Sequence, residues 1–133
     1  MAVVSHDWTV WVDYFQGVEN PETNWLNTEL DLQRLGLTDV ILCKVLQSIR
    51  DEVAAKQVER RLLTLEVFDA GGVELAREAA RNYRALRSRG HTVRKTIDCL
   101  IATFCLRGQH SLLHHDRDFD PFEKFLKLSV VHA

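Results

Sequence analysis

Apolar positions along the chain follow two patterns, and each pattern predicts one kind of element. Short apolar runs favour buried strands, which we expect at residues 2–5, 65–68, 111–114 and 129–132. Longer segments with apolar residues three and four positions apart favour helices. Strands separated by helical segments are typical of a parallel sheet that is covered on both faces. We therefore expect an α/β fold.

Capping residues and turns bound the helical segments. Pro21 suits the first turn of a helix, Thr38 can cap a second helix, and Gly90 can end a third. Residues 36–38 predict a turn. We expect helices at residues 9–15, 20–34, 38–61, 73–88, 92–106 and 121–126. The apolar stripe of the helix at 73–88 is expected to comprise Val73, Ala76, Ala80, Tyr83 and Leu86.

Composition adds limits on domain number, compartment and partners. The 133 residues have no repeat or linker and predict one domain over residues 1–133. Acidic residues interrupt the early apolar run, so we expect neither a secretory leader nor a membrane span. Three cysteines without CxxC spacing suggest buried, reduced thiols of a cytoplasmic protein. A net charge of −2 excludes a generally basic nucleic-acid binder, so phosphate contacts must come from a local patch or from metal ions.

Four carboxylates stand where the chemistry of an α/β protein is expected. Asp7 follows the first predicted strand, and Asp116 and Asp118 follow the strand at 111–114. Ligands of an open α/β sheet bind beyond the carboxyl ends of its strands. Asp98 lies at the margin of a helix's apolar stripe, where a carboxylate is costly to bury unless a cation meets it. Converging carboxylates would favour magnesium or manganese.

A second interpretation of the same acids needs no metal. Asp7 could cap the first helix, Asp116 and Asp118 could form a turn, and Asp98 could be half exposed. Spacing alone leaves both interpretations open.

Several longer segments resemble one family, the PIN-domain ribonucleases of the VapC toxin type. The opening VSHDWTVWVDYF is similar to the family's first strand and helix. VRKTIDCLIATFCLRG resembles the family helix with a central Asp, and SLLHHDRDFDPF resembles its L-L-H-x-D-x-D-F signature. LTDVILCKVLQSIRD matches the segment that carries the family's glutamate, and AREAARNYRALRSRGHTVR follows the family pattern. The resemblance therefore spans nearly the whole chain, in the family's order.

The resemblance implies both a fold and a function. It implies a three-layer α/β/α PIN fold with a central parallel sheet of about five strands. Asp7, Asp98 and Asp116 match the metal carboxylates, and Asp118 matches a nearby supporting acid. The implied protein is a Mg²⁺-dependent endoribonuclease toxin, with Mn²⁺ as a possible substitute, that cleaves RNA with a metal-activated water. The implied partners are a VapB-like antitoxin and a second copy of the chain, in the cytoplasm.

One position of the implied metal site departs from the family, and two neighbouring positions depart as well: Trp8 replaces a small residue after Asp7, and Ser48 replaces a Gly. Lys44 stands where the family has Glu, and no other acid stands in, because Asp39 lies five residues earlier and Asp51 follows later. An ammonium at this point could pair with Asp7 or Asp98 and weaken metal binding. Two hypotheses follow: an active metal-dependent ribonuclease, or a PIN-fold binding module that engages RNA or an antitoxin without turnover.

Other groups have alternative interpretations. His110, His114 and His115 could hold zinc or iron, although their spacing fits no common ligand pattern. Arginines and a lysine gather before Asp98 and form either a solvated helical face or a contact for RNA or antitoxin; they are Arg81, Arg84, Arg87, Arg89, Arg94 and Lys95. The early aromatics are expected partly in the core and partly in a groove for a partner helix; they are Trp11, Tyr14, Phe15 and Trp25.

Overall fold

A five-stranded parallel sheet forms the centre of the protein, as the α/β pattern predicts. The structure is a computed structural model that describes residues 2–5, 8–29, 34–114 and 116–132. The strand order is β3-β2-β1-β4-β5, and every neighbouring pair is parallel. The strands are β1 (Val3–Ser5), β2 (Leu35–Thr38), β3 (Glu66–Phe68), β4 (Ser111–Leu113) and β5 (Ser129–Val131). The three-layer α/β/α class is therefore confirmed.

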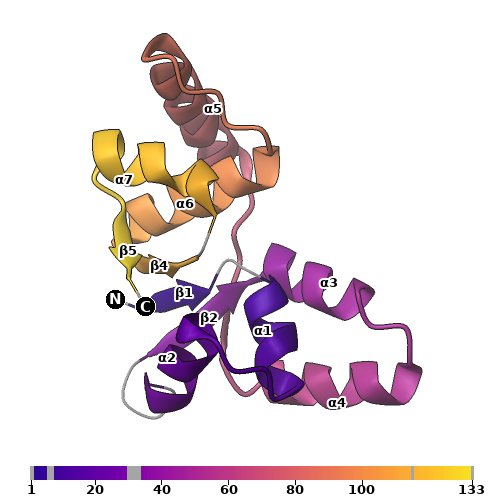
Figure 1. Ribbon diagram of the computed structural model, residues 1–133. Helices are drawn as coiled ribbons and strands as arrows, with labels where there is room; N and C mark the ends of the chain where they lie inside the picture. The colour runs from indigo at the N-terminus through magenta and orange to yellow at the C-terminus, as the bar shows by residue number, and fades with distance from the viewer. Residues whose placement is uncertain (1, 6–7, 30–33, 115, 133) are drawn as a thin grey trace.

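Helices cover both faces of this sheet. They are α1 (Trp8–Phe15), α2 (Pro21–Glu29), α3 (Asp39–Gln47), α4 (Glu52–Leu62), α5 (Val73–Ser88), α6 (Thr96–Gly108) and α7 (Asp120–Leu126), with a short 3₁₀ helix η1 (Arg117–Phe119). In Figure 1, α6 and α7 lie above the sheet, α2 and α4 lie below it, and α5 packs outside α6. None of the described helices is long and apolar enough to cross a lipid bilayer.

The core is built on the central strands. Val4, Leu37 and Leu112 are fully buried on neighbouring strands, and Ile101 of α6 and Phe119 of η1 are buried against them. All five positions are apolar, as a sheet covered on both faces requires. Because the core holds the strand ends in fixed register, it also fixes the residues that follow them.

The predicted turn at residues 36–38 is wrong, because this segment is strand β2. Leu35 and Leu37 are buried and Gly36 pairs with Val4 on one side and with Glu66 on the other. Gly36 leaves room for the Phe68 ring of β3, since a Cβ there would lie 2.6 Å from Phe68 Cε2 and 2.7 Å from the Glu66 carbonyl oxygen. The glycine that suggested a turn therefore permits close packing inside the sheet.

The predicted single helix over residues 38–61 is two helices. Thr38 caps α3 as expected, with its Oγ1 accepting from the Ile41 amide at 3.3 Å. The helix ends at Gln47, and Asp51 caps α4 by accepting a hydrogen bond from the Ala54 amide at 3.0 Å. A charged segment without apolar periodicity hides such a break, because only the cap at Asp51 marks it.

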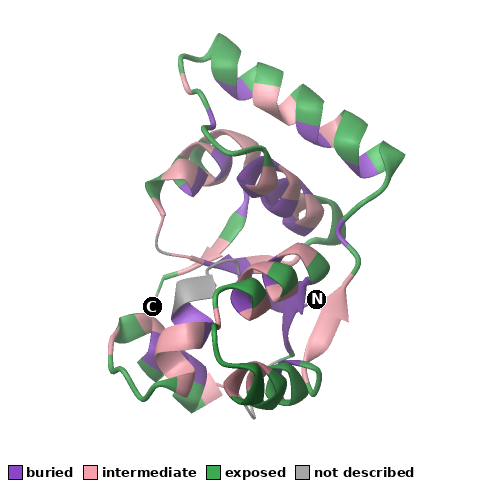
Figure 2. Ribbon diagram, turned by 90° about the vertical axis from the view of Figure 1, so that its right-hand side faces the viewer, coloured by how far each residue is buried: buried purple, intermediate pink, exposed green. Residues whose placement is uncertain are grey.

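Two details of the later helices also differ from the prediction. Helix α5 buries Leu75, Ala79 and Leu86, whereas Ala76 and Ala80 are exposed and Val73 is 74% exposed. Leu86 is therefore buried as predicted, whereas Leu75 and Ala79 are buried in place of the neighbouring Ala76 and Ala80. Figure 2 shows exposed residues along much of this long helix at its top. Helix α6 begins at Thr96 rather than near residue 92.

Gly36→Ala should destabilise the protein by about 1–3 kcal/mol, because the new methyl group meets the Glu66 backbone as well as the Phe68 ring. Gly71→Ala is the control, since its nearest neighbour would be Asp69 Oδ1 at 3.8 Å. Urea denaturation of both variants measures the difference. Equal stability of Gly36→Ala and the parent would contradict the close packing of β2 against β3.

Candidate functional site

The strand order creates one position in the sheet where ligands are expected. From β1 the chain proceeds to β2 and β3 on one side, and β4 then returns to the other side of β1. The carboxyl ends of β1 and β4 therefore flank the switch point of the sheet, the usual ligand site of open α/β folds. Asp7 follows β1 but lies outside the described residues, and Asp116 follows β4.

Asp98 reaches the same edge from a helix. Helix α6 leads into β4, so its carboxyl end lies near the start of β4 and its amino end near the end of β4. Asp98 is in the first turn of α6. Its exposed fraction is 1%, so it is buried rather than half exposed. A carboxylate at this depth requires compensating charge or hydrogen bonds.

The structure brings Asp98, Asp116 and Asp118 together. One carboxylate oxygen from each lies within 4.8 Å of the other two. Among the residues that the structure describes, these three aspartates form the group of acidic, histidine or cysteine side chains that lie close enough together to share a metal ion. Asp98 is buried, and Asp116 and Asp118 are partly exposed, so the cluster opens to solvent on one side.

Local hydrogen bonds hold Asp116 and Asp118 in place. The Asp116 amide donates to His114 Nδ1 at 3.0 Å, and Asp116 Oδ1 accepts from the Asp118 amide at 2.9 Å. Asp116 is thereby the cap of η1. The turn expected at Asp116 and Asp118 is therefore present, and the same turn places both carboxylates in the acidic cluster. The turn and a metal site are compatible interpretations of these two acids.

Arg94 is the cation next to this cluster. Its Nη2 and Nε atoms donate to the two carboxylate oxygens of Asp118 at 3.2–3.3 Å. The hydrogen bonds and charge of Asp118, with smaller effects from Asp116 and Asp98, raise the pKa of Arg94. Sequence reasoning placed Arg94 in a basic segment but missed this pair, because its partners are 24 residues apart and no spacing rule links them.

Lys44 lies in the last turn of α3 and is half-buried. Helix α3 starts where β2 ends, so it begins at the same edge of the sheet as the acids. Among the described carboxylates, none forms an ion pair with Lys44 within 4.0 Å. A contact between Lys44 and the acidic cluster therefore stays a prediction.

The two described histidines of the predicted group, His110 and His114, lie at opposite ends of β4. His110 precedes β4 and His114 follows it, so their backbones are about 13 Å apart along the strand. His110 Nδ1 accepts from the Ala2 amide at 3.1 Å, and burial lowers its pKa. His114 packs against Phe119, with ring centroids 4.7 Å apart. His115 lies outside the described residues, and His110 and His114 cannot share one ion in this arrangement.

The cysteines offer no activated nucleophile. Burial raises the pKa of Cys99, and it raises the pKa of Cys105 to about 12. Both thiols therefore remain protonated near neutral pH. Cys43 is exposed, which corrects the expectation that all three cysteines are buried.

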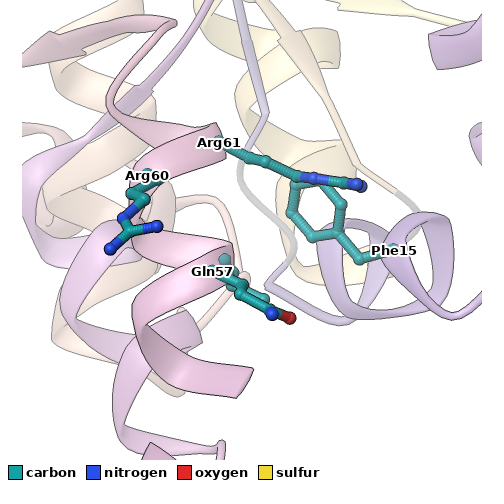
Figure 3. Close-up of a pocket in the computed structure, with 5 residues that line it drawn as sticks. Phe15, Gln57, Arg60 and Arg61 are labelled. Atoms are coloured by element: carbon teal, nitrogen blue, oxygen red, sulfur yellow. The ribbon is translucent and has the colours of Figure 1, made fainter. Parts of the chain in front are cut away.

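A groove between α1 and α4 is lined by one of the early aromatic residues, Phe15, together with Gln57, Val58, Arg60 and Arg61. Figure 3 shows the Arg61 side chain over the Phe15 ring, 5.6 Å from its centroid, whereas Arg60 points away. Of the early aromatics, Trp11 is buried and Tyr14, Phe15 and Trp25 are half-buried. Trp11 is therefore in the core, as expected for part of this set, and a partner helix in the groove stays a prediction.

Comparisons with known proteins point to one family. A model of the PIN domain matches residues 7–124. A VapC ribonuclease of Mycobacterium bovis (Mb1587) and ribonuclease VapC11 of Mycobacterium tuberculosis are each 30% identical to this chain, over 94% of it and 95% of the relative.

Solved structures share the fold at lower sequence identity. The structure of VapBC2 from Rickettsia felis bound to a DNA fragment from the promoter matches with a TM-score of 0.73 and 13% identity, covering 97% of both chains. FitAcB from Neisseria gonorrhoeae matches with a TM-score of 0.68 and 14% identity, covering 98% of this chain and 96% of that one.

Proposed function

The chain belongs to the PIN domain family, and on this premise we propose that it is a VapC-like endoribonuclease toxin of a toxin–antitoxin system. The observation that supports the activity most directly is the cluster of Asp98, Asp116 and Asp118 at the switch point of the sheet. Relatives named VapC ribonuclease, aligned over 94% of the chain, support the same function. We propose that residues 1–133 form a single PIN domain.

The chemistry of the cluster fits a divalent cation. Its donors are all carboxylate oxygens, which Mg²⁺ and Mn²⁺ prefer over softer ligands. Oxygens on opposite sides of one Mg²⁺ are about 4.2 Å apart, close to the 4.8 Å limit of the cluster. Asp98 and Asp116, with Asp7 by its family match, would hold the ion, whereas Asp118 is committed to Arg94.

We assign a separate role in RNA hydrolysis to each residue of the acidic cluster. A bound Mg²⁺ would supply an activated water and stabilise charge on the scissile phosphate, so no covalent protein intermediate is needed. Asp98 is buried and fixed by its helix, so it contributes a ligand that does not move. Asp116 is oriented by its hydrogen bonds with His114 and the Asp118 amide. Asp118 supports the site by holding Arg94 beside it.

The partners follow from the family and from the groove beside Phe15. We propose single-stranded or looped RNA as the substrate and a VapB-like antitoxin as the protein partner, in the cytoplasm. The toxin–antitoxin complex from Klebsiella pneumoniae shares this fold, with a TM-score of 0.65 and 15% identity, which supports this partner. We propose that the toxin forms a homodimer and that an amphipathic antitoxin helix lies in the groove between α1 and α4.

Asp98→Asn should lower the rate of RNA cleavage by about a hundredfold or more, because it removes the charge of a buried ligand. Cleavage of labelled RNA in Mg²⁺, Mn²⁺ and EDTA measures this effect. Asp69→Asn is the control, because it changes an exposed aspartate outside the cluster. Cleavage that is equally fast in EDTA and in Mg²⁺ would refute the metal-dependent mechanism.

Lys44→Glu should tighten Mg²⁺ binding about tenfold or more and raise the rate of RNA cleavage, because it replaces a repelling cation with a carboxylate. Lys44→Ala should have a smaller effect, since it removes the charge without adding a ligand. Without metal the order reverses: Lys44→Glu adds repulsion among the acids and should melt at a lower temperature than the parent in EDTA. Isothermal titration, cleavage assays and thermal melts measure these three effects.

Lys56→Glu makes the same charge change on the exposed face of α4 and should alter none of these quantities. A parent that cleaves RNA as well as Lys44→Glu does would mean that Lys44 lies outside the site. A parent that binds RNA or antitoxin but cleaves only after Lys44→Glu would instead favour the silenced binding module.

Phe15→Ala should weaken antitoxin binding about tenfold or more, because the ring is a large apolar surface in the groove and supports Arg61. Arg60→Ala should have a smaller effect, since this side chain points away from Phe15. Titration calorimetry with the separately purified antitoxin measures the affinity of both variants. Light scattering of the toxin alone should give the mass of a dimer. A monomer at micromolar concentration that captures no antitoxin would count against this assembly.

A further inference from the structure

Arg94 presents one edge of its guanidinium to the acidic cluster and leaves the other edge open. The edge formed by Nε and Nη2 donates to both oxygens of Asp118 at 3.2–3.3 Å. No described residue accepts a hydrogen bond from Nη1, and the side chain is 75% exposed. An arginine has five N–H donors, and the two on Nη1 remain available to a second anion.

An incoming phosphate would meet electrostatic repulsion from the acidic cluster beside Arg94. Asp98, Asp116 and Asp118 together carry up to three negative charges within 4.8 Å, and the whole chain has a net charge of −2. An RNA phosphate must approach this cluster closely for its bond to be cut. A fixed cation at the rim lowers that repulsion and also gives the phosphate a defined position.

The ion pair with Asp118 explains why an arginine suits this position. Guanidinium groups bind phosphate and carboxylate through two parallel hydrogen bonds, and one guanidinium has more than one edge for such contacts. Asp118 is only 14% exposed and can therefore restrict the exposed Arg94 side chain to one orientation. A lysine ammonium would keep the charge but would lose this two-edged geometry.

We propose that Arg94 is a substrate-binding residue that contacts a backbone phosphate of the RNA next to the acidic cluster, and that Asp118 is the positioning residue that holds it there. This inference rests on the proposed ribonuclease function. It gives Asp118 a role apart from metal binding, and it selects one member of the basic segment before α6 as the contact to RNA.

The test is RNA binding under conditions in which cleavage is blocked. The probe is a fluorescein-labelled single-stranded RNA of mixed sequence, measured by anisotropy with Ca²⁺ in place of Mg²⁺ and again in EDTA, at several salt concentrations. Arg94→Gln should weaken binding about five- to tenfold, and the slope of log K against log salt should become shallower by about 0.7, the value for one phosphate contact to single-stranded RNA. Arg94→Lys should keep the slope and lose part of the affinity.

Arg77→Gln is the matched control. Arg77 also pairs with a carboxylate, Glu74 at 3.2 Å, but it is exposed near the start of α5, close to the other end of α6. Its loss should leave affinity and slope unchanged. Asp118→Asn should weaken binding two- to threefold, and adding it to Arg94→Gln should cause no further loss, because both changes remove one contact.

Three outcomes would overturn the proposal. Arg94→Gln could bind with the affinity and slope of the parent, or Arg77→Gln could lose as much affinity as Arg94→Gln, which would indicate a general charge effect. In either case a parent that cleaves RNA keeps the ribonuclease function and only the role of Arg94 is lost. A parent that neither binds nor cleaves RNA would remove both. Thermal melts of the Arg94 variants confirm that the fold is intact.

Discussion

Parallel strands end at one edge of a sheet, and the candidate site depends on this constraint. Asp116 and Asp98 come from different elements, one after β4 and one inside α6. They meet because α6 runs back across the sheet before β4, so its first turn and the end of β4 lie at the same edge. The switch point between β1 and β4 then leaves room there, since the connections from the two strands diverge.

Gathering acids at one edge has an electrostatic cost that the fold reduces in several ways. Asp116 Oδ1 accepts a hydrogen bond from the Asp118 amide in η1, and the Asp118 carboxylate forms an ion pair with Arg94. Asp98 is the most costly member, because its carboxylate is buried in a helix that otherwise packs apolar residues against the sheet. A divalent cation bound at this cluster, as proposed, would add stability and so would tie metal binding to the stability of the sheet edge.

The sequence predicts most of the strands, and the acids that follow them, better than it predicts how the side chains pack around the site. Apolar runs identify four of the five strands, but β2 is missed because Gly36 indicates a turn unless the ring of Phe68 is known to lie against it. The helix break before Asp51 is missed because a charged segment carries no periodic signal. The positions of Asp116 and Asp118 follow from the strand that precedes them, whereas the depth of Asp98 depends on how α6 packs. The pair of Arg94 and Asp118 is set by tertiary structure alone.

Two cations are expected to affect the proposed metal site, and their surroundings give them opposite expected effects. Arg94 is largely exposed and paired with Asp118, so it adds positive charge at the solvent side of the acidic cluster. Lys44 is half-buried on α3, and at the family's glutamate position its ammonium would compete with the metal for the same oxygens, with less screening by water. In the proposed mechanism, positive charge at the rim favours the substrate, whereas positive charge among the ligands opposes the ion. The proposed activity therefore depends on whether each cation lies beside the carboxylates or among them.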